Sequence, residues 1–514
     1  MASVDTEFRS NLPPSSGLLG GVAQRLDVTV EALRLLLTLL AGYPIAYVYC
    51  KYIVNSQAKR LHHLYFAICG ASLCYFNYGL DVYHSLLGIL TTYLLGLFLR
   101  HKPTIFLTIN FIFHMTYLML GYYYTASNEY DILWTMPHCI LVLRMIGYGF
   151  DLTDGLKPQS ELSEDQKETN LPQFPSLLEL LAFAYFPGGF LVGPQFPYRR
   201  YQRFIDGEFR KHKGQLEAGL NRLAAGVLYM IVSQVGLYYL PDSYFLSPEF
   251  TQLSLIRRMY YLGFWAKFSL YKYISCWLFT EGALICIGFT FKKASETGPD
   301  GNADWSGCSN VKLVHLETGN TMEHYVQTFN VNTNQWVGRY IYKRLRFLNN
   351  RMISYGASLV FLAIWHGFHS GYYMAFVMEY MIVSTEKQIT NMYEKKILPN
   401  YGIYFKDKAV YKAIHFFALK SYNIIYMGWC LSSFVFLKYE RWIRVYSAVN
   451  YFGFIYMLIW AAFYHGYFYF YEGPRQQQAK RARRLEDEAK RNNDDNESKS
   501  KENENLVEEN AKNK

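Results

Sequence analysis

Two histidines lie within one of the most apolar stretches of the chain. His366 and His369 fall in the run 359–372, which otherwise carries mainly aliphatic and aromatic residues and two glycines. An ionisable side chain at membrane depth is costly and normally faces protein or water. Histidine also exchanges a proton near neutral pH. The spacing of three predicts that the two rings share a helix face. They are therefore candidates for a general base or for a hydrogen-bonded packing pair.

A metal centre is the next alternative for these histidines. A membrane di-iron site would need several close histidine pairs, but the only close pairs among the thirteen histidines are His62/His63 and His366/His369. No acidic residue stands at ligand spacing beside His366. The eight cysteines form no CxxC pair, and most lie inside apolar runs, as is typical of free buried thiols. We therefore predict neither a metal site nor a disulfide framework.

A second candidate is the segment 329–336, with the sequence FNVNTNQW, in which Asn330, Asn332 and Asn334 alternate before Trp336. A neutral amide offers both a hydrogen-bond donor and an acceptor. It can orient a hydroxyl or stabilise an oxyanion without placing a charge in a membrane cavity. The other interpretation is a polar turn that caps the following helix.

A cationic run follows this segment directly. It consists of Arg339, Lys343, Arg344 and Arg346, at helical spacing. Guanidinium and ammonium groups bind phosphate oxygens well, so the run could receive a phosphorylated substrate. The alternative is the positive flank that membrane proteins carry on the cytosolic side of a span.

The elements that position these residues follow from composition. The chain has 514 residues, of which 51% are hydrophobic, 18% aromatic and only 18% charged. These values exclude a disordered chain, a collagen, a coiled coil and a disulfide-rich secreted domain, and they favour a polytopic membrane protein. The net charge of +10 sits in short clusters between apolar runs. This pattern fits anionic lipid headgroups or a phosphorylated substrate, and we expect no nucleic-acid partner.

Apolar runs near the length of a membrane span recur along the chain. We expect ten to twelve membrane segments in an all-α helical bundle, some of them re-entrant or interfacial. The expected spans are 33–53, 63–80, 83–99, 103–124, 132–150, 219–240, 258–273, 276–291, 353–379, 410–437 and 447–470. The apolar stretch 176–196 is broken by Pro187-Gly188-Gly189 and Gly193-Pro194, which favours a re-entrant or interfacial segment.

Three parts of the chain differ in composition. Residues 1–28 are polar, residues 29–473 hold the apolar runs and all the candidate residues, and residues 474–514 are charged with almost no apolar side chain. The last part cannot bury enough surface to fold alone, so we expect a disordered tail. Its basic start at residues 480–484 follows the last span, which favours a cytosolic location.

The ordered motifs resemble those of the membrane-bound O-acyltransferase (MBOAT) family, and most of all those of the type-3 lysophosphatidylcholine acyltransferases. The central match is Trp365-His366-Gly367 together with Asn330, 36 residues earlier in the motif 329–334. Further matching blocks are 121–125, 134–139, 190–196 and 277–282. The resemblance covers roughly residues 30–470.

The resemblance implies a helical membrane bundle with an internal tunnel, His366 as the catalytic histidine and Asn330 as its partner. It implies transfer of a polyunsaturated acyl group from acyl-CoA to the sn-2 hydroxyl of lysophosphatidylcholine, and also of lysophosphatidylserine and lysophosphatidylethanolamine. Such an enzyme binds no permanent cofactor and uses acyl-CoA as co-substrate. The expected tunnel residues are Trp134, His138, Asn332, Trp336, Trp365 and His369. The expected location is the endoplasmic reticulum membrane, and a homodimer stays open.

Two other functions compete with this hypothesis. The first is an acyltransferase of the same fold with a sterol, a diacylglycerol or a protein as acceptor. The second is a lipid transporter or scramblase without enzymatic activity, because broken helices are typical of transporters. The sequence contains neither paired charges at mid-membrane nor an inverted repeat that would favour transport.

Overall fold

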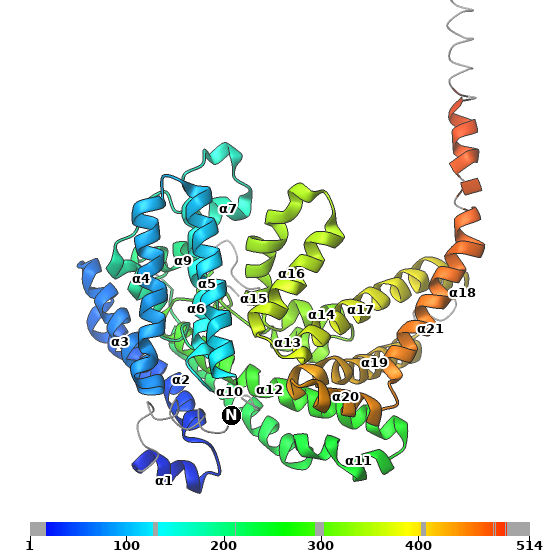
Figure 1. The fold of residues 1–514 in the computed structure, drawn as a ribbon, viewed down its shortest axis with the longest axis horizontal. Coiled ribbons are helices and arrows are strands. Elements are labelled where there is room, and N and C mark those ends of the chain that lie inside the picture. Colours follow the sequence, from blue (N-terminus) through cyan, green and yellow to red (C-terminus); the bar gives the residue numbers. More distant parts are fainter. Residues whose placement is uncertain are drawn as a thin grey trace, which may run out of the picture. The chain divides into compact units, whose positions relative to one another are not determined.

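The computed structural model describes residues 17–126, 132–210, 212–292, 303–401, 408–475, 477–478, 480–488 and 490. Within these residues all regular structure is helical (Figure 1). The described residues up to Asn450 belong to one compact unit, and those from Tyr451 onward belong to a second. All candidate residues named above lie in the first unit.

The first half of the first unit consists mainly of long helices. They are α1 (Leu18–Arg25), α2 (Val30–Val48), α3 (Lys59–Tyr78), α4 (Val82–Leu99), α5 (Pro103–Thr125), α6 (Thr135–Asp154), α7 (Glu164–Thr169), α8 (Leu177–Ala184), α9 (Tyr198–Ile205), α10 (Gln215–Tyr239), α11 (Pro248–Gln252) and α12 (Leu255–Ile287). A π-helical turn at Tyr49–Ile53 extends α2, and short 3-10 turns lie at Gly79–Asp81, Gln159–Glu161 and Asp242–Leu246.

The second half begins with short helices and continues with long ones. They are α13 (Leu313–Thr318), α14 (Met322–Thr328), α15 (Val331–Val337), α16 (Arg351–His366), α17 (Ser370–Met392), α18 (Leu398–Tyr401), α19 (Ala409–Phe436) and α20 (Tyr439–Ala448). The turns between them are η7 (Gly338–Tyr342), η8 (Lys343–Leu348) and η9 (Tyr393–Ile397). The second unit contains α21 (Phe452–Tyr467) and the turn Phe468–Glu472.

Five helical stretches of the described residues are long and apolar enough to cross a membrane. They are Val30–Ile53, Lys59–Leu99, Pro103–Thr125, Gln215–Leu246 and Leu255–Ile287. The stretch Lys59–Leu99 contains α3 and α4, which the sequence predicts as two spans. The all-α membrane fold is thereby confirmed, whereas the number of ten to twelve segments stays a prediction.

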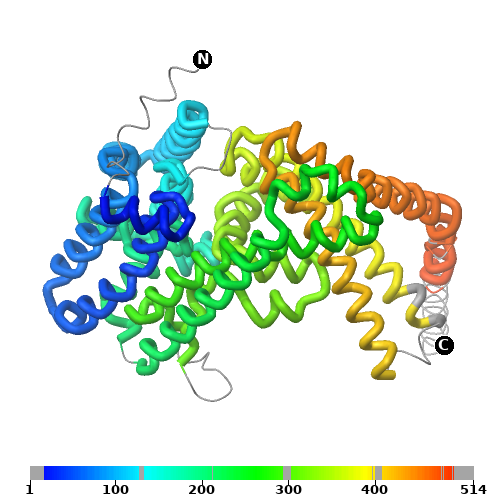
Figure 2. The backbone as a smooth tube through the Cα atoms, turned by 90° about the horizontal axis from the view of Figure 1, so that it is seen from below, coloured from blue at the N-terminus to red at the C-terminus, as the bar shows by residue number. Residues whose placement is uncertain are grey.

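Three expected spans differ from the structure. The spans 258–273 and 276–291 are one continuous helix, α12, which packs along α10 and against α2 and α19 (Figure 2). The span 353–379 is instead divided, because α16 ends at His366 and α17 begins at Ser370. His366 and His369 therefore do not share a helix face. The backbone of Gly367, with φ near 120°, causes this break.

The broken stretch 176–196 contains no long helix, and its re-entrant or interfacial location stays a prediction. It contains only α8, followed by irregular backbone up to α9. A large hydrophobic core lies around this region, where Phe66, Phe186 and Phe289 pack with fully buried tyrosines. A second core joins α5, α6, α15 and α16, and it includes Trp336 and Trp365. The two cores hold the irregular backbone and the ends of α15 and α16 in place.

Candidate functional site

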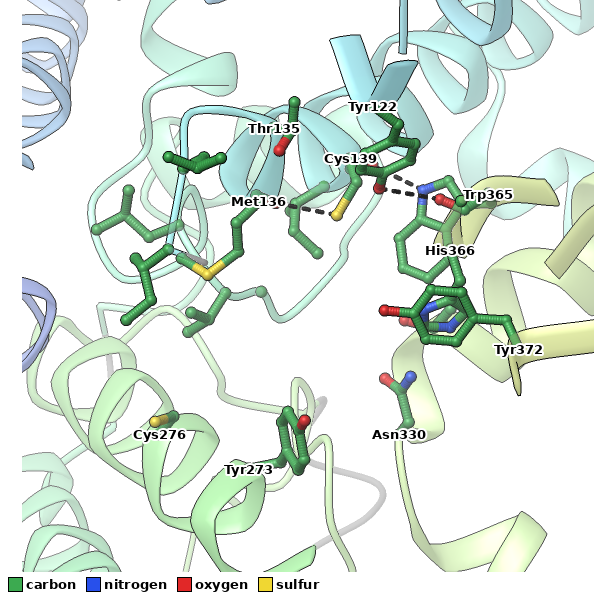
Figure 3. A pocket seen from close by; sticks show the side chains of 18 of the residues that line it. Tyr122, Thr135, Met136, Cys139, Tyr273, Cys276, Asn330, Trp365, His366 and Tyr372 are labelled. Carbon is green, nitrogen blue, oxygen red and sulfur yellow. Dashed lines mark hydrogen bonds between the residues drawn. The ribbon is translucent and has the colours of Figure 1, made fainter. Parts of the chain in front are cut away.

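A cavity with a volume of about 510 Å³ lies between elements far apart in the sequence. Its lining comes from the start of α2, the end of α5, the start of α6, the segment 191–195, α12, Asn310, the start of α15 and the junction of α16 and α17. Most of the lining is apolar. His366 and Asn330 both belong to it (Figure 3).

His366 is positioned through the backbone of its neighbour Trp365. The Tyr122 hydroxyl on α5 donates to the Trp365 carbonyl at 3.1 Å, and the Trp365 indole donates to the Cys139 carbonyl on α6 at 2.9 Å. These bonds join the last turn of α16 to both neighbouring helices. Since α16 ends directly after His366, the imidazole projects at the end of a fixed helix.

Aromatic rings surround the His366 imidazole. The centroids of Tyr372, Phe434 and Phe376 lie 5.2, 5.1 and 5.6 Å from that of the imidazole. No acidic residue is among the residues that line the cavity. The arrangement therefore differs from a catalytic triad, in which a carboxylate orients the histidine. Here packing and the backbone of α16 restrict the ring instead.

Asn330 stands at the N-cap of α15, but its side chain does not cap the helix. Its backbone is left-handed, with φ of 50° and ψ of 43°, a conformation that asparagine tolerates better than most residues. The Asn310 amide donates to the Asn330 side-chain oxygen at 3.3 Å. The Asn330 amide is directed toward the side of the cavity where His366 and Tyr372 lie (Figure 3). Asn330 thus stands where a capping residue would, but its side chain makes no capping hydrogen bond to α15.

Asn310 is the residue that organises this turn, and the sequence reasoning missed it. Its backbone carbonyl accepts from the Val331 N–H at 2.9 Å. Its side-chain oxygen accepts from the Asn332 backbone N–H at 3.0 Å and from the Asn332 side-chain amide at 3.2 Å. Asn310 is buried and also lines the cavity. It lies 20 residues before Asn330 in an irregular segment, where no periodic signal marks it.

The irregular segment 191–195 forms one wall of the cavity and is held by side chains of two helices. The Trp277 indole donates to the Val192 carbonyl at 3.1 Å, and the Gln195 amide donates to the Ile140 carbonyl at 2.7 Å. The buried guanidinium of Arg144 donates to the carbonyls of Phe183, Ala184, Gly189 and Pro194. These bonds satisfy backbone groups that would otherwise be costly to bury.

The expected tunnel residues divide into three groups. Trp365 and His369 line the main cavity with His366. Asn332 and Trp336 line a smaller cavity of about 50 Å³, which shares Gln195 with the main one. Trp134 and His138 lie outside both linings. The Trp134 ring stacks on the His84 ring with 3.6 Å between the ring centroids, and His138 packs edge-on against Trp134.

The four expected phosphate ligands lie on the turns η7 and η8. Arg339 contacts Glu168 at 3.3 Å, Lys343 pairs with Asp165, and Arg344 binds the carboxylate of Asp154 through two nitrogens. Arg346 is exposed. Arg339 also lines the smaller cavity.

The sequence predicts that no part of the chain holds a metal, whereas the structure describes only part of the chain. In the described ranges, no group of three or more histidine, cysteine, aspartate or glutamate side chains could hold a metal ion. All eight cysteines are free thiols.

The model of the family described as MBOAT, membrane-bound O-acyltransferase family, matches residues 119–429. Lysophospholipid acyltransferase 5 of Drosophila melanogaster is 67% identical over 481 residues, which cover 94% of this chain and 96% of that protein. The Homo sapiens protein of the same name is 37% identical over 444 residues, covering 86% and 90%. The Caenorhabditis elegans protein is 33% identical over 456 residues, covering 86% and 93%.

The matched range begins in α5 and ends in α19, so it contains His366, Asn330 and most of the cavity lining. With its apolar spanning helices, the chain is a multi-pass membrane protein and an acyltransferase. It belongs to the membrane-bound O-acyltransferase family.

Proposed function

We propose that this enzyme transfers an unsaturated acyl group from acyl-CoA to the sn-2 hydroxyl of lysophosphatidylcholine and of the corresponding serine and ethanolamine lysophospholipids. His366 acts as the general base and Asn330 as its polar partner. The observation that carries the proposal is that these two residues, 36 positions apart, line the same largely apolar cavity. The names of the relatives, lysophospholipid acyltransferase 5, support the class of acceptor.

The reaction follows from the two polar groups. A lipid hydroxyl is a poor nucleophile, and a neutral imidazole in reach removes its proton as the oxygen attacks the thioester carbonyl. The tetrahedral intermediate then expels the CoA thiolate, which takes the proton from the His366 imidazolium. The products are the new ester and CoA–SH. Because a thiolate leaves readily, no acyl-enzyme is needed.

Asn330 acts at the charge that develops on the carbonyl oxygen or at the attacking hydroxyl. The Asn310 amide donates to its side-chain oxygen, which leaves the Asn330 amide nitrogen as the group directed to substrate. A neutral donor held before the reaction begins stabilises an oxyanion better than water does, typically by about 10²–10³-fold in kcat. This supports the oxyanion role over the hydroxyl role.

The remaining assignments belong to the same proposal. The smaller cavity and the cations of η7 and η8 supply a polar approach for the CoA portion, with phosphates near Arg339, Lys343, Arg344 and Arg346. Residues 29–473 form the catalytic region. The enzyme acts in the endoplasmic reticulum membrane, and the charged tail 474–514 faces the cytosol.

The test is acyl transfer by the purified protein from arachidonoyl-CoA to lysophosphatidylcholine, with wild type beside His366→Ala and His369→Ala. Loss of at least about 10²-fold in kcat for His366→Ala is expected, since general-base catalysis contributes about 10²–10⁴-fold. His369→Ala is the matched control, because it removes a histidine from the same lining. Equal turnover by wild type and His366→Ala would contradict the role of the base.

The same assay separates the alternative acceptors. Sterol, diacylglycerol and lysophospholipids compete in one reaction containing labelled arachidonoyl-CoA, and label in the phospholipid product is expected. Label only in a sterol ester or a triacylglycerol would show that the acceptor is a different lipid, while the acyltransferase activity itself would stand. Lipid flux in proteoliposomes without acyl-CoA would favour the transporter.

A further inference from the structure

An acidic segment covers the cations that are proposed to receive the phosphates of the acyl donor. We name residues 154–169 the acidic strap and residues 338–348 the cationic turn. The acidic strap contains Asp154, Glu161, Glu164, Asp165 and Glu168 against Lys157 and Lys167, a net charge of −3. The cationic turn contains Arg339, Lys343, Arg344 and Arg346 without an acidic residue, a net charge of +4.

The two segments are joined by ion pairs along their length. Arg339 contacts Glu168 at 3.3 Å, Lys343 pairs with Asp165, and an Arg344 nitrogen donates to Asp154 at 2.9 Å. Each of these three cations of the cationic turn is therefore neutralised by a carboxylate of the strap.

The strap is held at both ends, and its exposed carboxylates lie on α7 between them. The Asp154 side chain is fully buried at the start of the strap, Thr169 is buried at its end, and the Leu171 N–H just after the strap donates to the Asp151 carbonyl just before it, at 2.9 Å. The side chains of Asp165 and Glu168, by contrast, are 36% and 65% exposed. Exposed ion pairs contribute little to stability. The outer carboxylates can therefore exchange with other anions at small cost, whereas Asp154 stays in place.

One of the cations that the strap covers lies beside a cavity that adjoins the site. Arg339 lines the smaller cavity, and Gln195 lines both this cavity and the one that contains His366. An anion bound at Arg339 would therefore be placed beside a cavity that meets the cavity of His366 at Gln195.

We propose that the acidic strap is a specificity element for the acyl donor: Asp165 and Glu168 compete for Arg339 and Lys343, and a donor that carries several phosphate charges displaces them. This inference rests on the proposed function, because it takes acyl-CoA as the donor. A phosphate group carries more charge and more acceptor oxygens than a carboxylate. It therefore binds the two cations more tightly and displaces the carboxylates. An acyl thioester without phosphates has no charge with which to displace the carboxylates, so Arg339 and Lys343 stay paired with Asp165 and Glu168.

The test compares two donors in three proteins. The donors are arachidonoyl-CoA and S-arachidonoyl-pantetheine, which has the same thioester but no phosphate. The proteins are wild type, the double variant Asp165→Asn/Glu168→Gln, and Glu164→Gln. Glu164 is the matched control because it lies on the same helix α7 but pairs with Lys167, at 2.8 Å, and not with the cationic turn.

The double variant is expected to lower KM for arachidonoyl-CoA by about threefold to tenfold, the size of effect that one or two exposed ion pairs produce. Its KM for the pantetheine thioester should stay unchanged, as should both KM values of Glu164→Gln. An unchanged or raised KM for the CoA donor would overturn the proposal. So would an equal change for both donors, which would indicate a merely structural role.

Failure of the proposed function is distinguishable from failure of this inference. Turnover of neither donor by wild type would contradict the function, and binding of CoA itself by calorimetry in the same three proteins would then decide the role of the strap. Tighter binding of CoA to the double variant alone supports the proposal, and equal binding to all three proteins overturns it.

Discussion

At the scale of single residues, the candidate site combines a packed histidine with an asparagine oriented by a second asparagine. The sequence indicates His366 and Asn330 because both belong to recognisable motifs. It does not indicate Asn310 or Tyr122 as positioning residues, because they act on backbone and side-chain groups 20 and 243 residues away. Such contacts depend on how helices meet, and no local pattern records them.

The role of Asn310 leads to a prediction about turnover. Asn310→Asp keeps the oxygen that accepts from Asn332 but loses the N–H that donates to Asn330. We expect kcat to fall about five- to thirtyfold with little change in KM, as a lost orienting hydrogen bond of about 1–2 kcal/mol implies. Steady-state kinetics with both substrates varied measures the two constants separately.

Asn334→Asp is the matched control for this prediction. Asn334 lies in the same turn, but its amide donates to the carbonyls of Val326 and Phe329, and the residue does not line the cavity. Its kcat should stay near that of wild type. If both variants lost turnover equally, the effect would belong to the folding of the turn and not to the orientation of Asn330.

At the scale of elements, the break between α16 and α17 is the feature that composition conceals. The run 353–379 is mainly apolar, so the length criterion predicts one span. Gly367 permits the break, and the Gly371 N–H then donates to the Leu437 carbonyl beyond α19, at 2.8 Å. Hydropathy records neither a left-handed glycine nor a tertiary backbone contact. In the opposite direction, the sequence predicts a break between the spans 258–273 and 276–291, which α12 does not contain.

The close approach of α17 to the end of α19 can be tested at Gly371. A Cβ atom there would stand 2.0 Å from the Ser433 carbonyl oxygen and 2.7 Å from that of Leu437, both backbone atoms that cannot move independently. Gly371→Ala should therefore destabilise the protein by about 1–3 kcal/mol and lower the melting temperature. It should also lower kcat, since the displaced α17 carries the residues beside His366. Thermal unfolding in detergent and kcat are the two measurements.

Gly356 provides the control in the neighbouring helix. It lies inside α16, and a Cβ atom there would meet nothing within 4 Å. Gly356→Ala should raise stability by about 0.5–1 kcal/mol, because alanine favours the helix more than glycine does. A lower melting temperature for both variants would show that packing at the α17–α19 contact is not the cause.

At the scale of the whole molecule, residues between 32 and 437 converge on one cavity. The sequence predicts the class of this fold well, because composition and the recurrence of apolar runs do not depend on tertiary contacts. It cannot predict which residues of the expected tunnel line the cavity. Trp134 and His138 share a helix turn with lining residues such as Thr135 and Cys139, yet they face other helices. That outcome is decided by helix rotation, which is a property of the assembled bundle.

Asp151, a buried carboxyl group outside the expected spans, should make global stability depend on pH. Asp151 follows the expected span 132–150 and accepts from the Tyr340 hydroxyl at 2.8 Å. Burial raises the pKa of Asp151 from 3.8 to about 7, although hydrogen bonds from Thr169 and Tyr340 and the nearby Arg339 lower it. The folded protein thus keeps the proton of Asp151 up to about pH 7, whereas the unfolded chain releases it near pH 4.

The sign of the pH effect follows from this difference. Between about pH 4 and pH 7 the folded state binds more protons at Asp151 than the unfolded state, so stability falls as the pH rises. Each pH unit in this window lowers the free energy of unfolding by up to about 1.4 kcal/mol, and the loss is complete above about pH 7.

Asp151→Asn keeps the acceptor for Tyr340 but cannot ionise. Melting temperatures of both proteins from pH 5 to pH 8 should therefore diverge, with the variant gaining relative to wild type as the pH rises. The exposed Glu164→Gln should follow wild type throughout. Parallel curves for wild type and Asp151→Asn would mean that Asp151 is already ionised in the folded protein at pH 5, and that the contacts from Thr169, Tyr340 and Arg339 outweigh its burial.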